Sequence, residues 1–170
     1  MKAKIISQNK FKYIDEGAGT PIILLHGLMG SLSNFKNCVE ELPKKGFRIV
    51  MPLLPIYELP LLKTSATELS NFLNQFIIAL NLENFYLLGN SLGGHVGLIY
   101  TIQFQNKMKG LILTGSSGLY ENTLGGSFPK RGDYNFIKNK TEEVFFNPTC
   151  ATKSLVDEVF ETVNNRKKLI

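Results

Sequence analysis

Short, mostly apolar runs recur along the first two thirds of the chain, and stretches with helical spacing separate them. Runs of this kind are expected for parallel strands buried on both faces, and they occupy residues 22–25, 47–51, 85–88 and 109–114. Two earlier runs, 4–7 and 11–15, flank Gln8-Asn9-Lys10, which suits the turn of an antiparallel hairpin. Strands that alternate with helices imply βαβ units, so the pattern predicts an α/β fold with a mostly parallel sheet flanked by helices.

Helical spacing is clearest after residue 65. Ser65 and Glu68 have the spacing of a capping box, in which the carboxylate of Glu68 reaches back to the Ser65 amide. The apolar positions that follow form a single core-facing stripe: Leu69, Phe72, Leu73, Phe76, Ile77 and Leu80. A shorter helix is expected over 34–42, ending before Pro43. A third helix is expected after Ser91, where apolar residues recur at Val96, Ile99 and Tyr100.

Two stretches lack this regularity. Three prolines among apolar residues predict a stiff loop over 52–60. From Leu119 onward, glycine and proline separate helix-like pieces without a clear strand, and the last piece, 154–170, carries Leu155, Val159 and Val163 on one side. The pattern thus divides the chain into a strand-and-helix part, 1–118, and a helical part, 119–170.

The sharpest break in the pattern is at Ser91. The apolar run 85–88 stops at Gly89-Asn90-Ser91-Leu92-Gly93-Gly94, and helical spacing resumes directly afterwards. A serine with glycines two positions before and after it, between a strand and a helix, has the pattern of a nucleophile elbow. Glycine gives the backbone room where a β-carbon would meet the neighbouring strand or helix. An ordinary serine in a strand-to-helix turn is the alternative interpretation.

Together with this elbow, the run Ile22-Ile23-Leu24-Leu25-His26-Gly27-Leu28-Met29-Gly30 makes the chain resemble the α/β-hydrolase superfamily, of the cap-bearing type with a serine nucleophile. The resemblance covers essentially the whole chain. It implies that 1–118 is the N-terminal part of the hydrolase core and that 119–170 begins the helical cap, or lid. Relatives often carry an acidic, glycine-rich turn where this chain has Pro52-Leu53-Leu54-Pro55-Ile56-Tyr57, which would make the mouth of a pocket more apolar.

Ser91 is therefore the candidate catalytic nucleophile. Acyl transfer needs hydrogen-bond donors aimed at the developing oxyanion, and the backbone amide of Leu92, at the start of a helix, is one such donor. The resemblance puts the second donor at the backbone amide of Leu28, with Met29 as the alternative. It implies a serine hydrolase that acts on an ester, thioester or related acyl substrate through an acyl-enzyme on Ser91. In this superfamily, dehalogenases and epoxide hydrolases use a carboxylate at the elbow, so serine argues against both chemistries, whereas carbon–carbon bond hydrolysis stays open.

The general base and its acid partner are the missing parts of this site. In this fold the acid and then the histidine follow the serine along the chain. His26 precedes Ser91, and His95 follows it by one helical turn with no acid between them. Seven carboxylates come after Ser91, and none directly follows a strand-like run: Glu121, Asp133, Glu142, Glu143, Asp157, Glu158 and Glu161.

Residues 1–170 are accordingly interpreted as an N-terminal portion of a longer hydrolase that lacks the last core strands. The triad acid and histidine are expected downstream of residue 170, and this chain alone is expected to be inactive. The strand at 109–114 would then be an unpaired apolar edge in the isolated chain. The rival interpretation is a non-catalytic α/β-hydrolase-like protein that binds a small ligand, and the missing base and acid favour it.

Composition narrows the class of protein further. A chain of 170 residues with 44% hydrophobic residues can bury one substantial core. Its net charge of +5 comes from lysines and arginines dispersed among turns and helix ends, so no nucleic-acid partner is predicted. Cys38 and Cys150 are too few for a disulfide framework, and no apolar stretch has the length of a signal peptide or membrane span, which together predict a cytoplasmic protein without a membrane partner. No phosphate-binding loop, dinucleotide fingerprint or metal-ligand spacing is present, so no cofactor or metal is predicted, and a small-molecule acyl substrate is the expected partner.

Overall fold

The computed structural model describes residues 4–28, 32–59, 65–104, 107–119 and 130–165. The chain separates into two compact units, Met1–Glu121 and Asn122–Ile170. Among the described residues, the first unit holds the sheet and three α-helices, and the second unit holds two α-helices.

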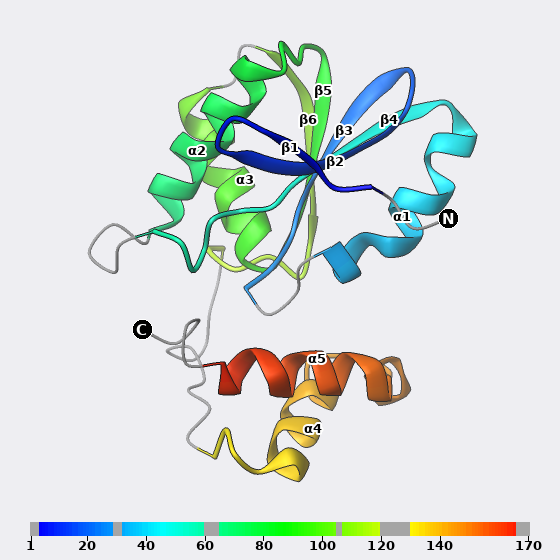
Figure 1. The fold of residues 1–170 in the computed structure, drawn as a ribbon, viewed down its shortest axis with the longest axis vertical. Helices are drawn as coiled ribbons and strands as arrows, with labels where there is room; N and C mark the ends of the chain where they lie inside the picture. The colour runs from blue at the N-terminus through cyan, green and yellow to red at the C-terminus, as the bar shows by residue number, and fades with distance from the viewer. Residues whose placement is uncertain (1–3, 29–31, 60–64, 105–106, 120–129, 166–170) are drawn as a thin grey trace. The chain divides into compact units, whose positions relative to one another are not determined.

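A six-stranded mixed sheet forms the centre of the first unit, with the strand order β1-β2-β4-β3-β5-β6 (Figure 1). Two antiparallel pairings join β1 to β2 and β2 to β4, and the remaining pairings, β4 with β3, β3 with β5 and β5 with β6, are parallel. The strands are β1 Ile6–Gln8, β2 Phe11–Gly17, β3 Thr20–Leu25, β4 Phe47–Pro52, β5 Phe85–Asn90 and β6 Met108–Thr114. The predicted fold class, a mostly parallel sheet flanked by helices, is confirmed, and every predicted strand is present within a few residues of its expected bounds.

Helices cover both faces of this sheet because its strands bury alternate residues on opposite sides (Figure 1). In β3, Ile23 and Leu25 belong to the core under α2 and α3, whereas Ile22 and Leu24 belong to the core under α1. The first unit contains η1 Leu32–Phe35, α1 Lys36–Glu41, η2 Pro43–Lys45, α2 Ala66–Ala79 and α3 Leu92–Gln103. The helix predicted over 34–42 is thus a 3-10 turn followed by a short α-helix.

The cap of α2 is only partly the one that the sequence predicts. The Ser65 hydroxyl accepts a hydrogen bond from the Glu68 amide at 3.1 Å, as expected of an N-cap. The carboxylate of Glu68, however, accepts from the side chain of Asn71 at 3.4 Å, and no hydrogen bond between described residues joins it to the Ser65 amide. The predicted reciprocal half of the capping box is therefore wrong.

The β6 strand lies at the end of the described sheet and pairs there with β5 alone. Its Ile112 side chain is 44% exposed. An apolar strand with an open edge is the feature that the sequence predicts for 109–114.

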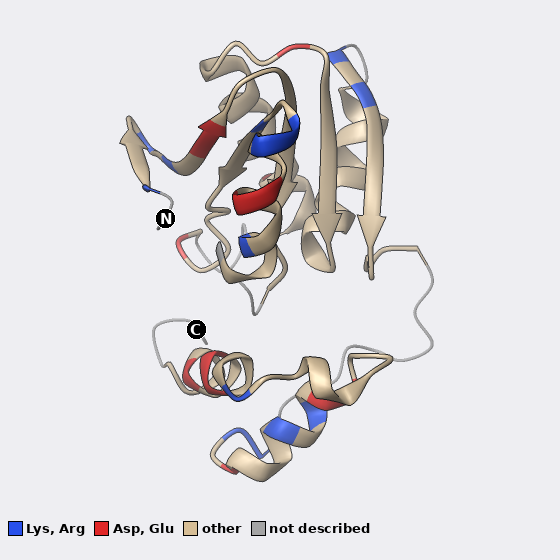
Figure 2. Cartoon of the chain, turned by 90° about the vertical axis from the view of Figure 1, so that its right-hand side faces the viewer, with Lys and Arg blue, Asp and Glu red and all other residues tan. Residues whose placement is uncertain are grey.

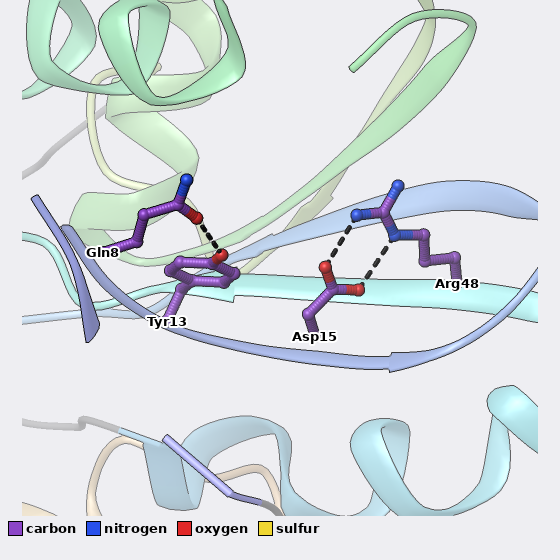
Figure 3. A network of polar contacts seen from close by, with 4 residues as sticks. All are labelled: Gln8, Tyr13, Asp15 and Arg48. Atoms are coloured by element: carbon purple, nitrogen blue, oxygen red, sulfur yellow. Dashed lines mark hydrogen bonds and ion pairs between the residues drawn. The ribbon is translucent and has the colours of Figure 1, made fainter. Parts of the chain in front are cut away.

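At the other side of the sheet, two polar contacts tie the antiparallel strands together (Figure 3). The Arg48 guanidinium on β4 donates to both carboxylate oxygens of Asp15 on β2, at 2.8 and 2.6 Å. The hydrogen bond with Asp15 raises the pKa of Arg48. The Tyr13 hydroxyl on β2 donates to the Gln8 side chain on β1 at 2.9 Å. These contacts fix the register of β1, β2 and β4 at a partly exposed edge.

The second unit is built from α4 Tyr134–Glu142, η5 Pro148–Cys150 and α5 Lys153–Asn164. The Tyr134 ring packs edge-on against Phe160 with centroids 5.3 Å apart, and its hydroxyl donates to Asp157 at 2.6 Å. On α5 the buried apolar residues are Val156, Val159 and Val163. Val159 and Val163 are buried as predicted, whereas Leu155 is only half-buried and its neighbour Val156 is buried in its place. Residues 166–170 of the predicted last helix lie outside the described residues.

Residues of both charge signs occur in α1 of the first unit and in the helices of the second (Figure 2). Exposed ion pairs join Lys44 to Glu41, Lys107 to Glu83, Lys140 to Glu143 and Lys153 to Asp157. Each such pair contributes little to stability because solvent screens it. None of the helices that the structure describes is both long and apolar enough to cross a membrane.

Candidate active site

Ser91 has the most unusual backbone of the described residues. Four non-glycine residues there have a positive φ, and the other three are asparagines, which tolerate this region. Ser91 has φ 51° and ψ −120°. These angles are typical of the first central residue of a type II′ turn, a position that glycine normally occupies. A serine held in this conformation is strained, and such strain persists only where the surrounding structure imposes it.

The close packing around two neighbouring glycines, Gly89 and Gly93, shows what imposes the strained backbone of Ser91. A β-carbon at Gly93 would lie 2.0 Å from the backbone oxygen of Leu25, at the end of β3. A β-carbon at Gly89 would lie 2.5 Å from the backbone oxygen of Gly93. The start of α3 is therefore packed directly on the ends of β3 and β5, and Ser91 is the residue that must turn between them.

The Ser91 hydroxyl is at the N-terminus of α3 but makes no capping hydrogen bond. The backbone carbonyl of Ser91 accepts hydrogen bonds from three backbone amides, those of Gly94, His95 and Ser117, at 3.0, 3.2 and 3.2 Å. Leu92, the first residue of α3, has a backbone amide without an intrahelical acceptor. The elbow thus presents a hydroxyl and, next to it, a backbone donor at the positive end of a helix.

The loop that follows β3 lies against this serine. A β-carbon at Gly27 would be 3.2 Å from the Ser91 β-carbon, a tighter contact than most β-carbons make, so glycine suits this close approach of the two backbones. The Gly27 amide donates to the side-chain oxygen of Asn34 at 3.3 Å. Leu28 is the next residue, and its side chain is 41% exposed. The alternative donor residue, Met29, lies outside the described residues.

His26 is buried and both of its ring nitrogens have partners. Nε2 accepts from the Leu54 amide at 3.0 Å, so the ring proton is on Nδ1, which donates to the Gly27 carbonyl at 2.9 Å. An imidazole bonded in this way connects two loops. Neither nitrogen is directed at the Ser91 hydroxyl, and His26 is not placed as a general base.

His95 lies one turn along α3 from the elbow, with its ring against the backbone of Gly118. A β-carbon at Gly118 would come within 2.5 Å of the ring carbon Cδ2. Among the described residues, no hydrogen bond joins the His95 ring to Ser91. The contact with Gly118 is a packing contact.

No acid lies between Ser91 and Glu121 in the sequence. Glu121 is outside the described residues, and the described carboxylates that follow all belong to the second unit. Asp133 caps α4 through the amides of Asn135 and Phe136, and Asp157 is paired with Lys153. Among the described residues, no group of three or more His, Cys, Asp and Glu side chains is arranged to hold a metal ion.

Two contacts at this site were not foreseen from the sequence. The Asn90 side chain, inside the elbow, donates to the backbone oxygen of Thr114 at 2.8 Å and so ties the elbow to the end of β6. The Tyr57 hydroxyl donates to the backbone oxygen of Leu28 at 2.8 Å. Neither residue belongs to a periodic pattern, so only the fold could reveal these contacts.

Comparison with known proteins places this geometry in context. The chain matches the family model for the alpha/beta hydrolase fold over residues 20–143. It is 27% identical over 147 residues to a 2-hydroxy-6-oxo-6-(2'-aminophenyl)hexa-2,4-dienoic acid hydrolase of Metapseudomonas resinovorans, covering 79% of this chain and 51% of that protein. It is 29% identical over 123 residues to Lipase 1 of Psychrobacter immobilis, covering 68% of this chain and 38% of the lipase.

A similar solved structure is that of an alpha/beta hydrolase enzyme from the metagenome of lagoon sediments at Mar Chica, Morocco. It matches with a TM-score of 0.71 and 38% sequence identity, over 98% of this chain and 61% of that one. The chain therefore spans about half the length of the curated relatives that it matches.

Proposed function

The chain belongs to the α/β-hydrolase family, and we propose that its full-length form is a serine hydrolase that forms an acyl-enzyme on Ser91. One observation carries the proposal. Ser91 adopts a strained backbone at the tip of β5, and the Gly27 loop is packed against it. This arrangement supports a nucleophile whose hydroxyl lies at the end of the sheet, next to the Leu92 amide at the start of α3, as nucleophilic acyl transfer requires.

In the proposed reaction, the Ser91 oxygen attacks the acyl carbon and its proton passes to a histidine. The oxyanion that forms is bound by the backbone amides of Leu92 and Leu28. Return of the proton to the leaving group breaks the original ester or thioester bond and leaves the acyl group on Ser91. Water, activated by the same histidine, then releases the acid.

The histidine and its acid partner are proposed to come from sequence downstream of residue 170. Three observations support this proposal. His26 uses both ring nitrogens to connect loops, and no acid follows Ser91 within the first unit before Glu121. The chain also covers only 51% of the dienoic acid hydrolase and 38% of the lipase. The unit Asn122–Ile170 is proposed to begin the cap over the site.

The proposed substrate is a small carboxylic ester or thioester. The names of the relatives justify testing two further classes: lipid esters, after Lipase 1, and 2-hydroxy-6-oxo-dienoic acids, after the hydrolase of Metapseudomonas resinovorans. The latter class would extend the same serine chemistry to a carbon–carbon bond. A cytoplasmic location is proposed as well.

A second candidate function is a non-catalytic binding protein for a small ligand. It is favoured by the absence, among the described residues, of a hydrogen bond between either histidine and Ser91. Such a protein would keep the pocket and lack turnover.

The test is the substitution Ser91→Ala in the full-length gene product, with hydrolysis of p-nitrophenyl butyrate as the assay. We expect kcat/KM to fall by about a thousandfold or more, because loss of a catalytic serine removes the covalent pathway. Ser7→Ala, which alters an exposed serine on β1, is the matched control and should retain wild-type activity. Unchanged turnover in Ser91→Ala would refute the assignment, and a wild-type protein that hydrolyses none of the three substrate classes would favour the binding protein.

A further inference from the structure

The segment after β4 is attached to the loop after β3 by two hydrogen bonds. Leu54 donates its amide to His26 Nε2 at 3.0 Å, and Tyr57 donates its hydroxyl to the Leu28 carbonyl at 2.8 Å. We propose that Tyr57 is a positioning residue that holds the Leu28 backbone in the orientation needed to bind the oxyanion. This inference rests on the proposed function of Ser91 and Leu28.

The two hydrogen-bonded carbonyls lie on either side of the Leu28 α-carbon. His26 Nδ1 holds the Gly27 carbonyl, which shares a planar peptide unit with the Leu28 amide. Because the carbonyl and amide of a trans peptide point in opposite directions, holding the Gly27 oxygen directs the Leu28 N–H. The Tyr57 hydroxyl holds the peptide unit on the other side of Leu28. Both units that flank Leu28 are thereby fixed, and with them the direction of its amide.

The Leu28 side chain does not provide this restraint by packing, because it is 41% exposed. Tyr57, in contrast, projects from a well-anchored segment. Its neighbours Leu54 and Ile56 are 6% and 5% exposed and belong to the core under α2. The Leu53 amide donates to Lys12 on β2 at 2.8 Å, which fastens the start of the segment to the sheet. A hydroxyl mounted on such a segment holds its acceptor in a fixed place.

The Tyr57 hydroxyl is suited to act as a permanent donor. Its ring packs against the same core, and burial raises the pKa of Tyr57 above its ordinary value. The phenol therefore stays protonated throughout the neutral range, and its hydrogen bond to the Leu28 carbonyl does not depend on pH there. The proline-containing segment thus has a defined task at the site.

The test is Tyr57→Phe in the full-length protein, which removes only the hydroxyl and keeps the ring. Loss of an entire oxyanion donor costs about a hundredfold to a thousandfold in kcat, so a donor that is merely less well held should cost about tenfold. KM for p-nitrophenyl butyrate should stay within about twofold, because the oxyanion exists in the transition state and not in bound substrate. Inhibition by butylboronic acid, whose serine adduct mimics the tetrahedral intermediate, should weaken by about the same tenfold.

Tyr13→Phe is the matched control, since it removes a tyrosine hydroxyl of the same unit that lies on β2 and donates to the Gln8 side chain rather than to Leu28. Active sites are titrated with a fluorophosphonate before each measurement, so that kcat refers to competent sites only. A role limited to folding would lower the titrated fraction and leave kcat per site unchanged, and that result would overturn the inference. If Ser91→Ala retains full activity, the proposed function itself fails; if only Tyr57→Phe does, the failure belongs to this inference alone.

Discussion

Substitution of Gly93 by alanine tests how closely α3 packs on the sheet at the elbow. The added β-carbon would lie 2.0 Å from the Leu25 oxygen, 2.5 Å from the Leu25 carbonyl carbon and 2.7 Å from the His26 oxygen. All three atoms are backbone, so no side-chain rotation can relieve the overlap. Either the end of β3 or the start of α3 must move.

The expected magnitude follows from two opposing effects. Alanine is favoured over glycine in a helix by about 1 kcal/mol. Overpacking of a rigid site costs about 1–3 kcal/mol, and overlap with backbone at this distance belongs at the upper end. We therefore expect the free energy of unfolding to fall by about 2 kcal/mol on balance. The displaced elbow should also react more slowly with a fluorophosphonate.

Gly97→Ala is the matched control because it lies on the same helix and gives the same gain in helix preference. Its β-carbon would overlap the Leu111 side-chain atom Cδ1, at 2.9 Å, which can rotate away, and would make an ordinary contact with Leu25 Cδ1 at 3.8 Å. Its stability should remain within about 1 kcal/mol of wild type. Urea unfolding followed by far-UV circular dichroism measures both variants, since the chain has no tryptophan. Equal stability of the two variants would refute the close packing on which the elbow depends.

Three further substitutions test separate parts of the account. Ser91→Gly should be more stable than Ser91→Ala by about 1 kcal/mol in urea unfolding, because glycine tolerates the φ of 51° that strains alanine. Asp15→Asn should lower the free energy of unfolding by about 1 kcal/mol through loss of the two-point contact with Arg48, discounted for its partial exposure. Asp157→Asn should flatten the fall of thermal stability at acid pH. The hydrogen bond with Lys153, followed by the one with Tyr134, lowers the pKa of Asp157 below its ordinary value of 3.8. The stabilisation from the Asp157 carboxylate is therefore present above pH 3.8 and is lost as the pH falls through the lowered pKa.

Each of these has a control or a contrary result. Equal stability of the glycine and alanine variants at position 91 would mean that the backbone there is not strained. Glu41→Gln breaks an exposed ion pair with Lys44 and should leave stability close to that of wild type, so an equal loss in the two variants would show that the partial burial of the Asp15–Arg48 contact adds nothing. An acid limb that keeps its slope in Asp157→Asn would assign the pH dependence to another carboxylate.

The sequence predicted the sheet well because each strand is a compact apolar run bounded by turn residues. Residues 22–25 are buried on both faces, and in 85–88 fully buried residues alternate with half-buried ones, so the apolar composition of both runs marks them as central parallel strands. Helix α2 was equally accessible, since its stripe and the Ser65 cap are local signals. In the stripe of α5, Val159 and Val163 were predicted correctly and only Leu155 was wrong, because Leu155 and Val156 are both apolar and periodicity does not decide which of two adjacent residues is buried.

The elbow was predictable because its glycines and serine are close in sequence. The connection between the loops after β3 and β4 was not. It joins His26 to Leu54 and Tyr57 to Leu28, pairs separated by nearly thirty positions, through the backbone amide of Leu54 and the backbone carbonyl of Leu28. The identities of Leu54 and Leu28 carry little information about such backbone groups. Only the parallel pairing of β3 with β4, which brings their carboxyl ends together, makes these contacts possible.

The most direct measurement of the central claim is the site of covalent labelling. The full-length protein would be treated with a fluorophosphonate, digested, and its peptides sequenced by mass spectrometry. We predict one adduct per chain, located on Ser91, with complete loss of p-nitrophenyl butyrate hydrolysis as labelling reaches completion. Retained hydrolysis after full labelling of Ser91, or complete inactivation with the adduct on another residue, would contradict the assignment of Ser91 as the nucleophile.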